Sequence, residues 1–198
     1  MADGRDNALP PASSCQTACE ESQMSPNRIL VIRHAEEHDV AGVTDQGHAD
    51  GQSLTVRGWQ RAGALVRFFC PETRGLYMPD TIFASAVTSG SESLRPCQTV
   101  APLLAFMRSR GEIAYDQAFA KPDTTALAAE VMKRSGTVLI AWEHSRIPAI
   151  IAALPDAPPT PEEWPSDRYD LVWAIDRRHE GWIFTQVPQW LLAGDTSV

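Results

Sequence analysis

The sequence of 198 residues lacks the features of membrane proteins, of secreted proteins and of nucleic-acid-binding proteins. No apolar run approaches the roughly 18–20 residues that a membrane span needs. The polar residues 1–6 contain no apolar core of a signal peptide. Positive charge is scarce, because 17 Lys and Arg face 25 Asp and Glu and leave a formal net charge of -8. We therefore expect a cytoplasmic protein that binds neither nucleic acid nor membranes.

Cysteine is sparse and has no metal-binding spacing. The four cysteines are Cys15, Cys19, Cys70 and Cys97, and no two of them form a C-x-x-C pair. Structural zinc sites and redox pairs commonly use that spacing, so we expect reduced thiols without a metal. The composition is otherwise ordinary, with 43% hydrophobic and 21% charged residues.

The chain divides into an arm and one domain. Residues 1–27 are rich in Pro, Ser, Ala, Gln and Asp and show no periodicity, which predicts a disordered or loosely docked N-terminal arm. The domain covers residues 28–198. Apolar runs in it predict strands, with the weakest over 113–119: 28–33, 81–85, 113–119 and 137–142. Apolar residues at helical spacing, or start signals, predict helices: 59–69, 92–110, 124–134 and 147–154.

The last part of the chain differs from this alternation. Residues 155–165 are Pro-rich and predict a loop, and 170–176 with 182–187 predict a closing hairpin. Alternating strands and helices predict an α/β fold, with three α/β/α layers around a mostly parallel central sheet. Asp123 is expected to cap the helix that starts at Thr124.

Candidate functional residues cluster where strands end. Ligands of open α/β sheets bind at the carboxyl ends of the strands. Arg33 and His34 end the first strand, Ser85 ends the second, and His144 follows the strand that ends at Trp142. Arg95 lies early in the helix after the second strand. Two arginines and two histidines at one edge suit phosphoryl transfer, because guanidinium groups match phosphate oxygens and a neutral imidazole is a nucleophile.

Four ordered motifs resemble the histidine phosphatase superfamily, which includes the phosphoglycerate mutases. Residues 30–36 (LVIRHAE) resemble the strand with its RHG motif, and residues 54–62 (LTVRGWQRA) resemble the LTxxGxxQA helix start. Residues 83–99 are similar to the SPxxRxxQT element, and 143–145 (EHS) resemble the late strand-end histidine. The likeness spans residues 28–154.

The resemblance implies a phosphoglycerate-mutase-like fold, branch-one type, and a role for each matching residue. His34 would be the nucleophile that becomes phosphorylated, and Arg33, Arg95 and His144 would complete a catalytic and substrate-binding phosphate pocket. It implies a phosphatase that needs no cofactor or metal. Its partner would be a phosphorylated small molecule or a phosphoprotein, and the sequence says nothing of the oligomeric state.

The sequence departs from the family pattern in several places. Ala35 replaces the Gly after RH, and Ala86 replaces the Pro after Ser85. Ser145 stands where branch-two members have an Asp after the second histidine. No residue matches the general acid that protonates the leaving group, so three candidates stay open: Asp116, Asp123 and Glu143.

Three other functions are compatible with parts of the sequence. One is a phosphoglycerate mutase, and another is a non-catalytic phosphate-binding relative. The third is a zinc peptidase, because His34, Glu37 and His38 match H-x-x-E-H, although that motif requires a helix. Trp164 and Tyr169, near the Pro-rich loop, are candidates for the mouth of the pocket.

Overall fold

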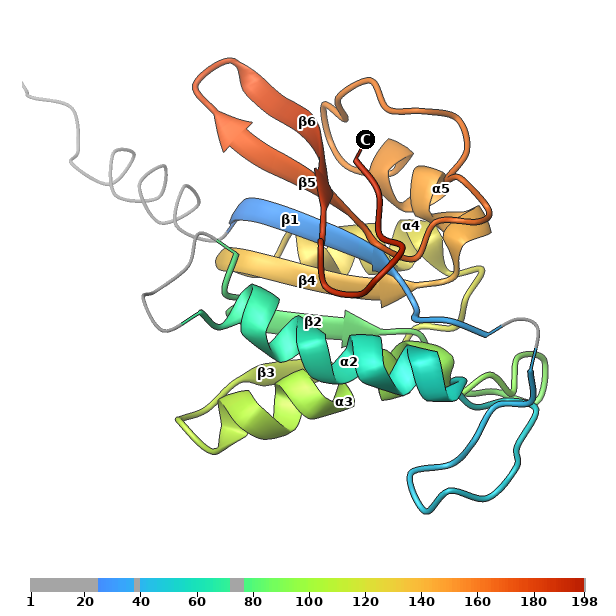
Figure 1. Cartoon of the computed structure of the whole chain (residues 1–198). Helices are drawn as coiled ribbons and strands as arrows, with labels where there is room; N and C mark the ends of the chain where they lie inside the picture. The colour runs from blue at the N-terminus through green and yellow to red at the C-terminus, as the bar shows by residue number, and fades with distance from the viewer. Residues whose placement is uncertain (1–24, 38–39, 72–76, 198) are drawn as a thin grey trace, which may run out of the picture.

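The computed structural model describes residues 25–37, 40–71 and 77–197. Among these residues the chain alternates between strands and helices before it ends in a hairpin (Figure 1). The strands are β1 (Pro26–Arg33), β2 (Thr81–Ala84), β3 (Ala114–Asp116), β4 (Gly136–Trp142), β5 (Leu171–Arg178) and β6 (Gly181–Pro188). The helices are α2 (Val56–Phe69), α3 (Arg95–Arg108), α4 (Thr124–Val131) and α5 (Ile147–Ala152).

The strands form one sheet in the order β3-β2-β4-β1-β5-β6. β1 pairs with β4 in parallel, and β2 pairs in parallel with both β4 and β3. β5 pairs antiparallel with β1 and with β6, which forms the hairpin at the end of the chain. The predicted mostly parallel sheet and the predicted closing hairpin are therefore confirmed.

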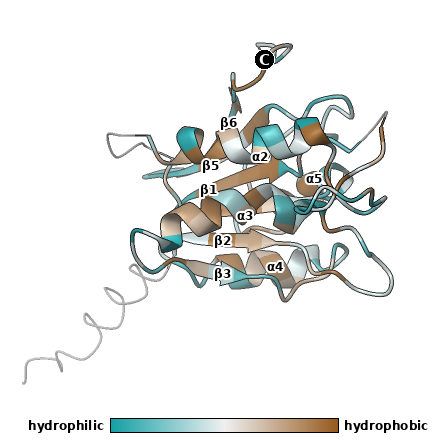
Figure 2. Ribbon diagram, turned by 60° about the horizontal axis from the view of Figure 1, so that its bottom comes forward, coloured by the Kyte–Doolittle hydropathy of each residue, from teal (hydrophilic) through white to brown (hydrophobic). Residues whose placement is uncertain are grey.

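Helices cover both faces of the sheet. Side chains of a strand alternate between its two faces, so a buried strand presents apolar side chains to the helices on each side. Leu30 and Ile32 of β1 pack in one apolar cluster with residues of α2 and α3. Ile29 and Val31 point the other way and pack with residues of α4 and α5. Figure 2 shows the central strands as the most hydrophobic part of the ribbon. The fold thus has the three layers that the sequence predicts.

Several predicted boundaries shift for local reasons. β1 begins at Pro26, two residues inside the predicted arm, while residues 1–24 of that arm lie outside the described residues, with Cys15 and Cys19. α3 begins at Arg95 rather than at 92, because the preceding residues form a turn closed by two hydrogen bonds between Thr88 and Ser91. α4 and α5 both end two or three residues before the predicted positions.

One individual prediction is wrong, and another holds only in part. Asp123 precedes α4 but makes no side-chain cap; its carboxylate instead accepts a hydrogen bond from the Ala120 N–H at 2.9 Å. Trp164 is a core residue, buried with its ring 5.0 Å from that of Trp173, although it also lines a hollow together with His144. Cys70 and Cys97 are free thiols.

None of the helices in the described part of the chain is long and apolar enough to cross a membrane.

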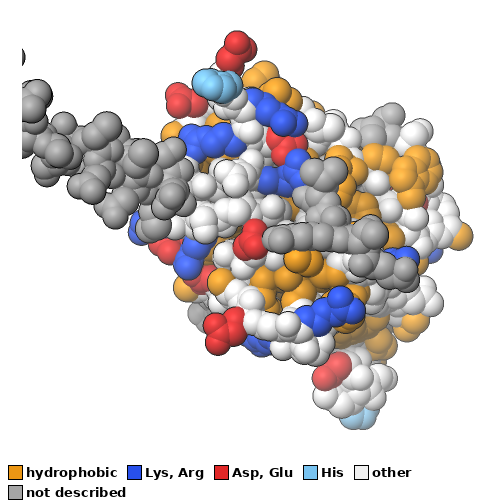
Figure 3. All heavy atoms as spheres, turned by 90° about the vertical axis from the view of Figure 1, so that its left-hand side faces the viewer, with side chains coloured by type: hydrophobic (Ala, Val, Ile, Leu, Met, Phe, Trp, Pro, Cys, Tyr) orange, Lys and Arg blue, Asp and Glu red, His pale blue; other side chains and the backbone are white. Residues whose placement is uncertain are grey.

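The edge of the sheet near the start of β1 carries acidic and basic side chains that are interspersed, with apolar side chains between them (Figure 3). The carboxyl ends of β1, β2 and β4 all point to the opposite edge (Figure 1).

Candidate active site

The register of the central strands brings the predicted residues to that opposite edge. Arg33 pairs with Trp142 across β1 and β4, and the His34 N–H donates to the Trp142 carbonyl at 2.9 Å. His144 follows two residues after Trp142, and the fully buried Ser85 follows β2 on the other side of β4.

His34 is buried and held in one tautomer. Its side chain has 2% of its surface exposed, and its Nδ1 lies 2.9 Å from the Ala35 carbonyl oxygen. A carbonyl oxygen only accepts hydrogen bonds, so Nδ1 must carry the proton and Nε2 keeps its lone pair. Burial lowers the pKa of His34 to about 4, against the opposing charge of Glu37, and the charges of Arg33 and Arg95 lower it further. The imidazole is therefore neutral at ordinary pH, with Nε2 available.

Two guanidinium groups meet beside His34, one from each of two distant segments. The Arg33 Nη2 lies 3.1 Å from Oε1 of Glu37, and the Arg95 Nη1 lies 2.7 Å from Oε2 of the same carboxylate. Oε1 also lies 3.6 Å from Nε2 of His34, which is too long for a hydrogen bond. The arginines and His34 thus form a cradle around one anionic group.

Arg33 is held in place by residues of the loop between α5 and β5. Its guanidinium donates to the Tyr169 hydroxyl at 2.9 Å and to the Ser166 carbonyl oxygen. The guanidinium carbon also lies 3.8 Å from the centre of the Tyr169 ring, a cation–π contact. Tyr169, a candidate for the pocket mouth, therefore supports the cradle from outside.

Arg95 is fixed by its position in the first turn of α3. Its guanidinium donates to the Gly51 carbonyl at 2.7 Å, which ties it to the loop before α2. In the same turn, the Thr99 hydroxyl donates to the Arg95 carbonyl and accepts from the Ala35 N–H, each at 2.8 Å. The RxxQT segment therefore joins Arg95 to the residue beside His34.

The LTxxG segment holds the other side of the loop after His34. Thr55 caps α2, because its hydroxyl accepts from the Gly58 N–H, and it also donates to the Glu36 carbonyl at 3.1 Å. A Cβ atom on Gly58 would lie 2.6 Å from that same carbonyl oxygen. Only glycine lets α2 approach the loop after His34 this closely.

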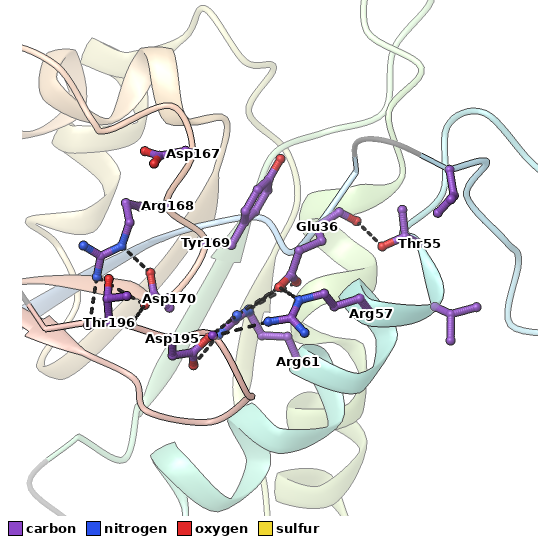
Figure 4. A pocket seen from close by; sticks show the side chains of 13 residues that line it. Glu36, Thr55, Arg57, Arg61, Asp167, Arg168, Tyr169, Asp170, Asp195 and Thr196 are labelled. Carbon is purple, nitrogen blue, oxygen red and sulfur yellow. Dashed lines mark hydrogen bonds and ion pairs between the residues drawn. The ribbon is translucent and has the colours of Figure 1, made fainter.

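Glu36 points away from the cradle, into a separate network around Arg61. The Arg61 guanidinium donates to the Glu36 carboxylate at 2.9 Å and to that of Asp195 at 2.8 Å (Figure 4). Arg57 contacts Glu36 at 3.2 Å from the exposed side. These residues line a hollow of about 520 Å³ beside Tyr169. The network anchors the loop two residues after His34.

The three candidates for a general acid lie in different surroundings. Asp116 pairs with Arg134 at 3.4 Å, and Asp123 accepts from Ala120. Glu143 lies 3.6 Å from Lys121 and lines a hollow with it and with Arg95. Of the three, Glu143 is the one that shares a hollow with a residue of the cradle.

His144 is linked to the cradle through Ser166. It begins the short 3-10 turn His144–Arg146 and lines a hollow together with Ser166. The Ser166 carbonyl is the one that accepts from Arg33. The structure thus places Arg33, His34, Arg95 and His144 at one edge.

The H-x-x-E-H interpretation finds no helix. Residues 34–37 are not helical, and Glu37 is engaged by two arginines; His38 lies outside the described residues. The place of Glu37 inside the cradle could not be predicted from the sequence. Its position four residues after Arg33 was a signal only in a helix, where such residues are neighbours.

The chain is thus an α/β protein with a neutral, buried histidine between two arginines at the carboxyl edge of its sheet. No family model matches the sequence, and no curated protein matches it either. Several solved structures are similar to the chain at low sequence identity. The SixA protein of Agrobacterium tumefaciens is 19% identical with a TM-score of 0.46, over 82% of this chain and 97% of that one. The phosphoserine phosphatase of Entamoeba histolytica is 14% identical, with a TM-score of 0.46, over 83% and 99%. The alpha-ribazole phosphatase of Shigella flexneri is 14% identical, with a TM-score of 0.43, over 86% and 100%.

Proposed function

We propose that the chain is a histidine phosphatase, which takes a phosphoryl group from a phosphate monoester onto Nε2 of His34 and passes it to water. The observation that carries this proposal is the state of His34. Its Nδ1 proton is committed to the Ala35 carbonyl, and Nε2 faces the space between Arg33 and Arg95. A neutral imidazole with a lone pair directed into a cationic cradle is suited to attack a phosphorus atom.

The reaction has two steps. In the first, Nε2 bonds to phosphorus while the bond to the leaving oxygen breaks, and a general acid protonates that oxygen. In the second, water attacks phosphorus, the N–P bond breaks, and the water proton passes to the conjugate base of that acid. We assign the acid to Glu143, because it shares a hollow with Arg95.

The arginines stabilise the charge that spreads over the phosphoryl oxygens in the transition state. Arg33 and Arg95 supply two positive charges, and His144 is assigned to donate a further hydrogen bond to a phosphoryl oxygen. With these groups the step is proposed to need no metal. The substrate would be a phosphorylated small molecule or a phosphoprotein, in the cytoplasm.

The test is hydrolysis of para-nitrophenyl phosphate in excess EDTA by the wild type and by the His34→Ala variant. Activity should survive EDTA and fall at least about a thousandfold in the variant, because the nucleophile is lost. Wild type incubated briefly with a ³²P-labelled substrate should carry an acid-labile label that the variant lacks. Activity that EDTA abolishes, or that His34→Ala retains, would contradict the proposal.

A further inference from the structure

The cradle is occupied by a side chain of the protein itself. The Glu37 carboxylate lies 3.1 Å from Arg33, 2.7 Å from Arg95 and 3.6 Å from Nε2 of His34. It therefore faces all three groups that the proposed reaction assigns to the phosphoryl group. Its side chain keeps 13% of its surface exposed, so it reaches the cradle from the solvent side.

A phosphoryl group and this carboxylate cannot occupy the cradle together. Both are anions that accept hydrogen bonds from the same guanidinium N–H groups. Two like charges at that separation would repel strongly in a site screened from water. A phosphorus atom in reach of Nε2 would also have to lie where Oε1 of Glu37 now lies. Substrate binding thus requires the Glu37 side chain to swing out.

We propose that Glu37 is a built-in competitor for the cradle, which weakens the binding of phosphate and returns to expel it after each turnover. The proposal rests on the phosphatase function and adds to it a residue that governs product release. Inorganic phosphate, the product, would bind the same guanidinium groups as the phosphoryl group of the substrate. A resident carboxylate weakens the binding of both, and so limits inhibition by the product.

The surroundings allow the exchange. Without Glu37, Arg33 still binds the Tyr169 hydroxyl, and Arg95 still binds the Gly51 carbonyl. The two guanidinium groups therefore stay in place when the carboxylate leaves. The Tyr169 oxygen also has a hydrogen bond to the Glu37 backbone, so the movement needed is a rotation of the side chain alone.

The test compares the binding of inorganic phosphate to the wild type and to Glu37→Gln by titration calorimetry. The amide has the same shape but no charge, so it should compete poorly for the guanidinium groups. We expect phosphate to bind at least about tenfold more tightly, the scale of one charge-assisted hydrogen bond. Glu180→Gln is the matched control: it removes an exposed charge in the turn between β5 and β6, away from the cradle, and should change the affinity less than about twofold.

Steady-state kinetics separate competition from a structural role. If Glu37 competes, Glu37→Gln should lower the KM for para-nitrophenyl phosphate and lower the inhibition constant for phosphate about tenfold, while kcat falls or stays the same. Glu37→Asp keeps the charge on a shorter stem and should lie between the two. If Glu37 instead only positions the arginines, both substitutions raise KM and weaken phosphate binding, which would overturn the inference.

The two proposals fail in different ways. Hydrolysis that depends on His34, combined with Glu37→Gln binding phosphate no more tightly than the wild type, overturns the role of Glu37 and leaves the phosphatase standing. Failure of every variant, the wild type included, to bind phosphate or to hydrolyse phosphate compounds overturns both. Thermal melts of each variant, compared with the wild type, identify a misfolded protein before either conclusion is drawn.

Discussion

Glu36 and Glu37 are neighbours in sequence, and each carboxylate lies between two arginines, but the two sites have different properties. Arg57 and Arg61 hold Glu36 in a network that also includes Asp195 (Figure 4). Glu37 lies between the two arginines of the cradle, Arg33 and Arg95.

The difference shows what separates a structural ion pair from an exchangeable one. The Arg61 guanidinium, 3% exposed, divides its donors between two carboxylates and the Gln189 amide. The cradle arginines are instead anchored by a phenol and backbone carbonyls. Their anion can therefore be replaced without loss of their position.

The largest expected effect lies in the Glu36 network. Arg61→Ala removes the buried cation that Glu36 and Asp195 share and leaves them only the more exposed Arg57, which should lower the free energy of unfolding by about 3–5 kcal/mol. Arg57→Ala is the matched comparison, because Arg57 binds the same Glu36 but is 46% exposed; it should cost less than about 1 kcal/mol. Urea denaturation followed by circular dichroism measures both.

Equal losses from the two substitutions would contradict this ranking. An arginine of the cradle should behave differently from Arg61. Arg95→Ala should leave the unfolding free energy within about 1 kcal/mol of the wild type, since its contacts are partly exposed, yet it should remove most of the affinity for phosphate.

Much of the fold could be predicted because its signals are local. The apolar runs that became β1, β2 and β4 and the helical spacing that became α2 have one dominant period each. Parallel strands then carry their ends to one edge, which is why Arg33, His34 and His144 could be placed together without a structure. The start of α3 could not be placed well, because the Thr88–Ser91 turn forms through backbone hydrogen bonds that most residue types can make.

The different roles of Glu36 and Glu37 could not be predicted from the sequence. Glu36 pairs with Arg61, and Arg61 is held in place by Asp195 and Gln189, which lie more than 120 residues further along the chain. The burial of Trp164 in the core could not be predicted, for a related reason. An indole beside a Pro-rich loop suits a pocket mouth and a core equally well, and the position of Trp173 decides between them.

A smaller effect concerns the dependence of the Glu36 network on pH. Burial raises the pKa of Asp195, but hydrogen bonds from Arg61 and from the N–H groups of Leu192 and Leu191 outweigh it and lower that pKa from 3.8 to about 2. A carboxyl with a depressed pKa in the folded state stabilises the fold above its unfolded pKa and loses that contribution as pH falls. The wild type should therefore melt above Asp195→Asn at pH 6, and the gap should close between about pH 4 and pH 2. A gap that persists unchanged at pH 2 would show that the charge of Asp195 is not its source.

The smallest expected effect tests whether Tyr169 contributes to the cradle, since it contacts Arg33 and also lines the hollow of the Glu36 network. Tyr169→Phe keeps the ring under the guanidinium and removes the hydroxyl that accepts from Arg33, a loss of about 0.5–1.5 kcal/mol. Phosphate affinity should fall by roughly twofold to tenfold, with little change in melting temperature. Tyr169→Leu also removes the cation–π contact and should weaken binding further. If instead both variants bind phosphate like the wild type, the Ser166 carbonyl alone suffices to hold Arg33. In that case Arg33 is held in place by the backbone at Ser166, and the Tyr169 side chain is not needed to keep it there while the bound anion changes.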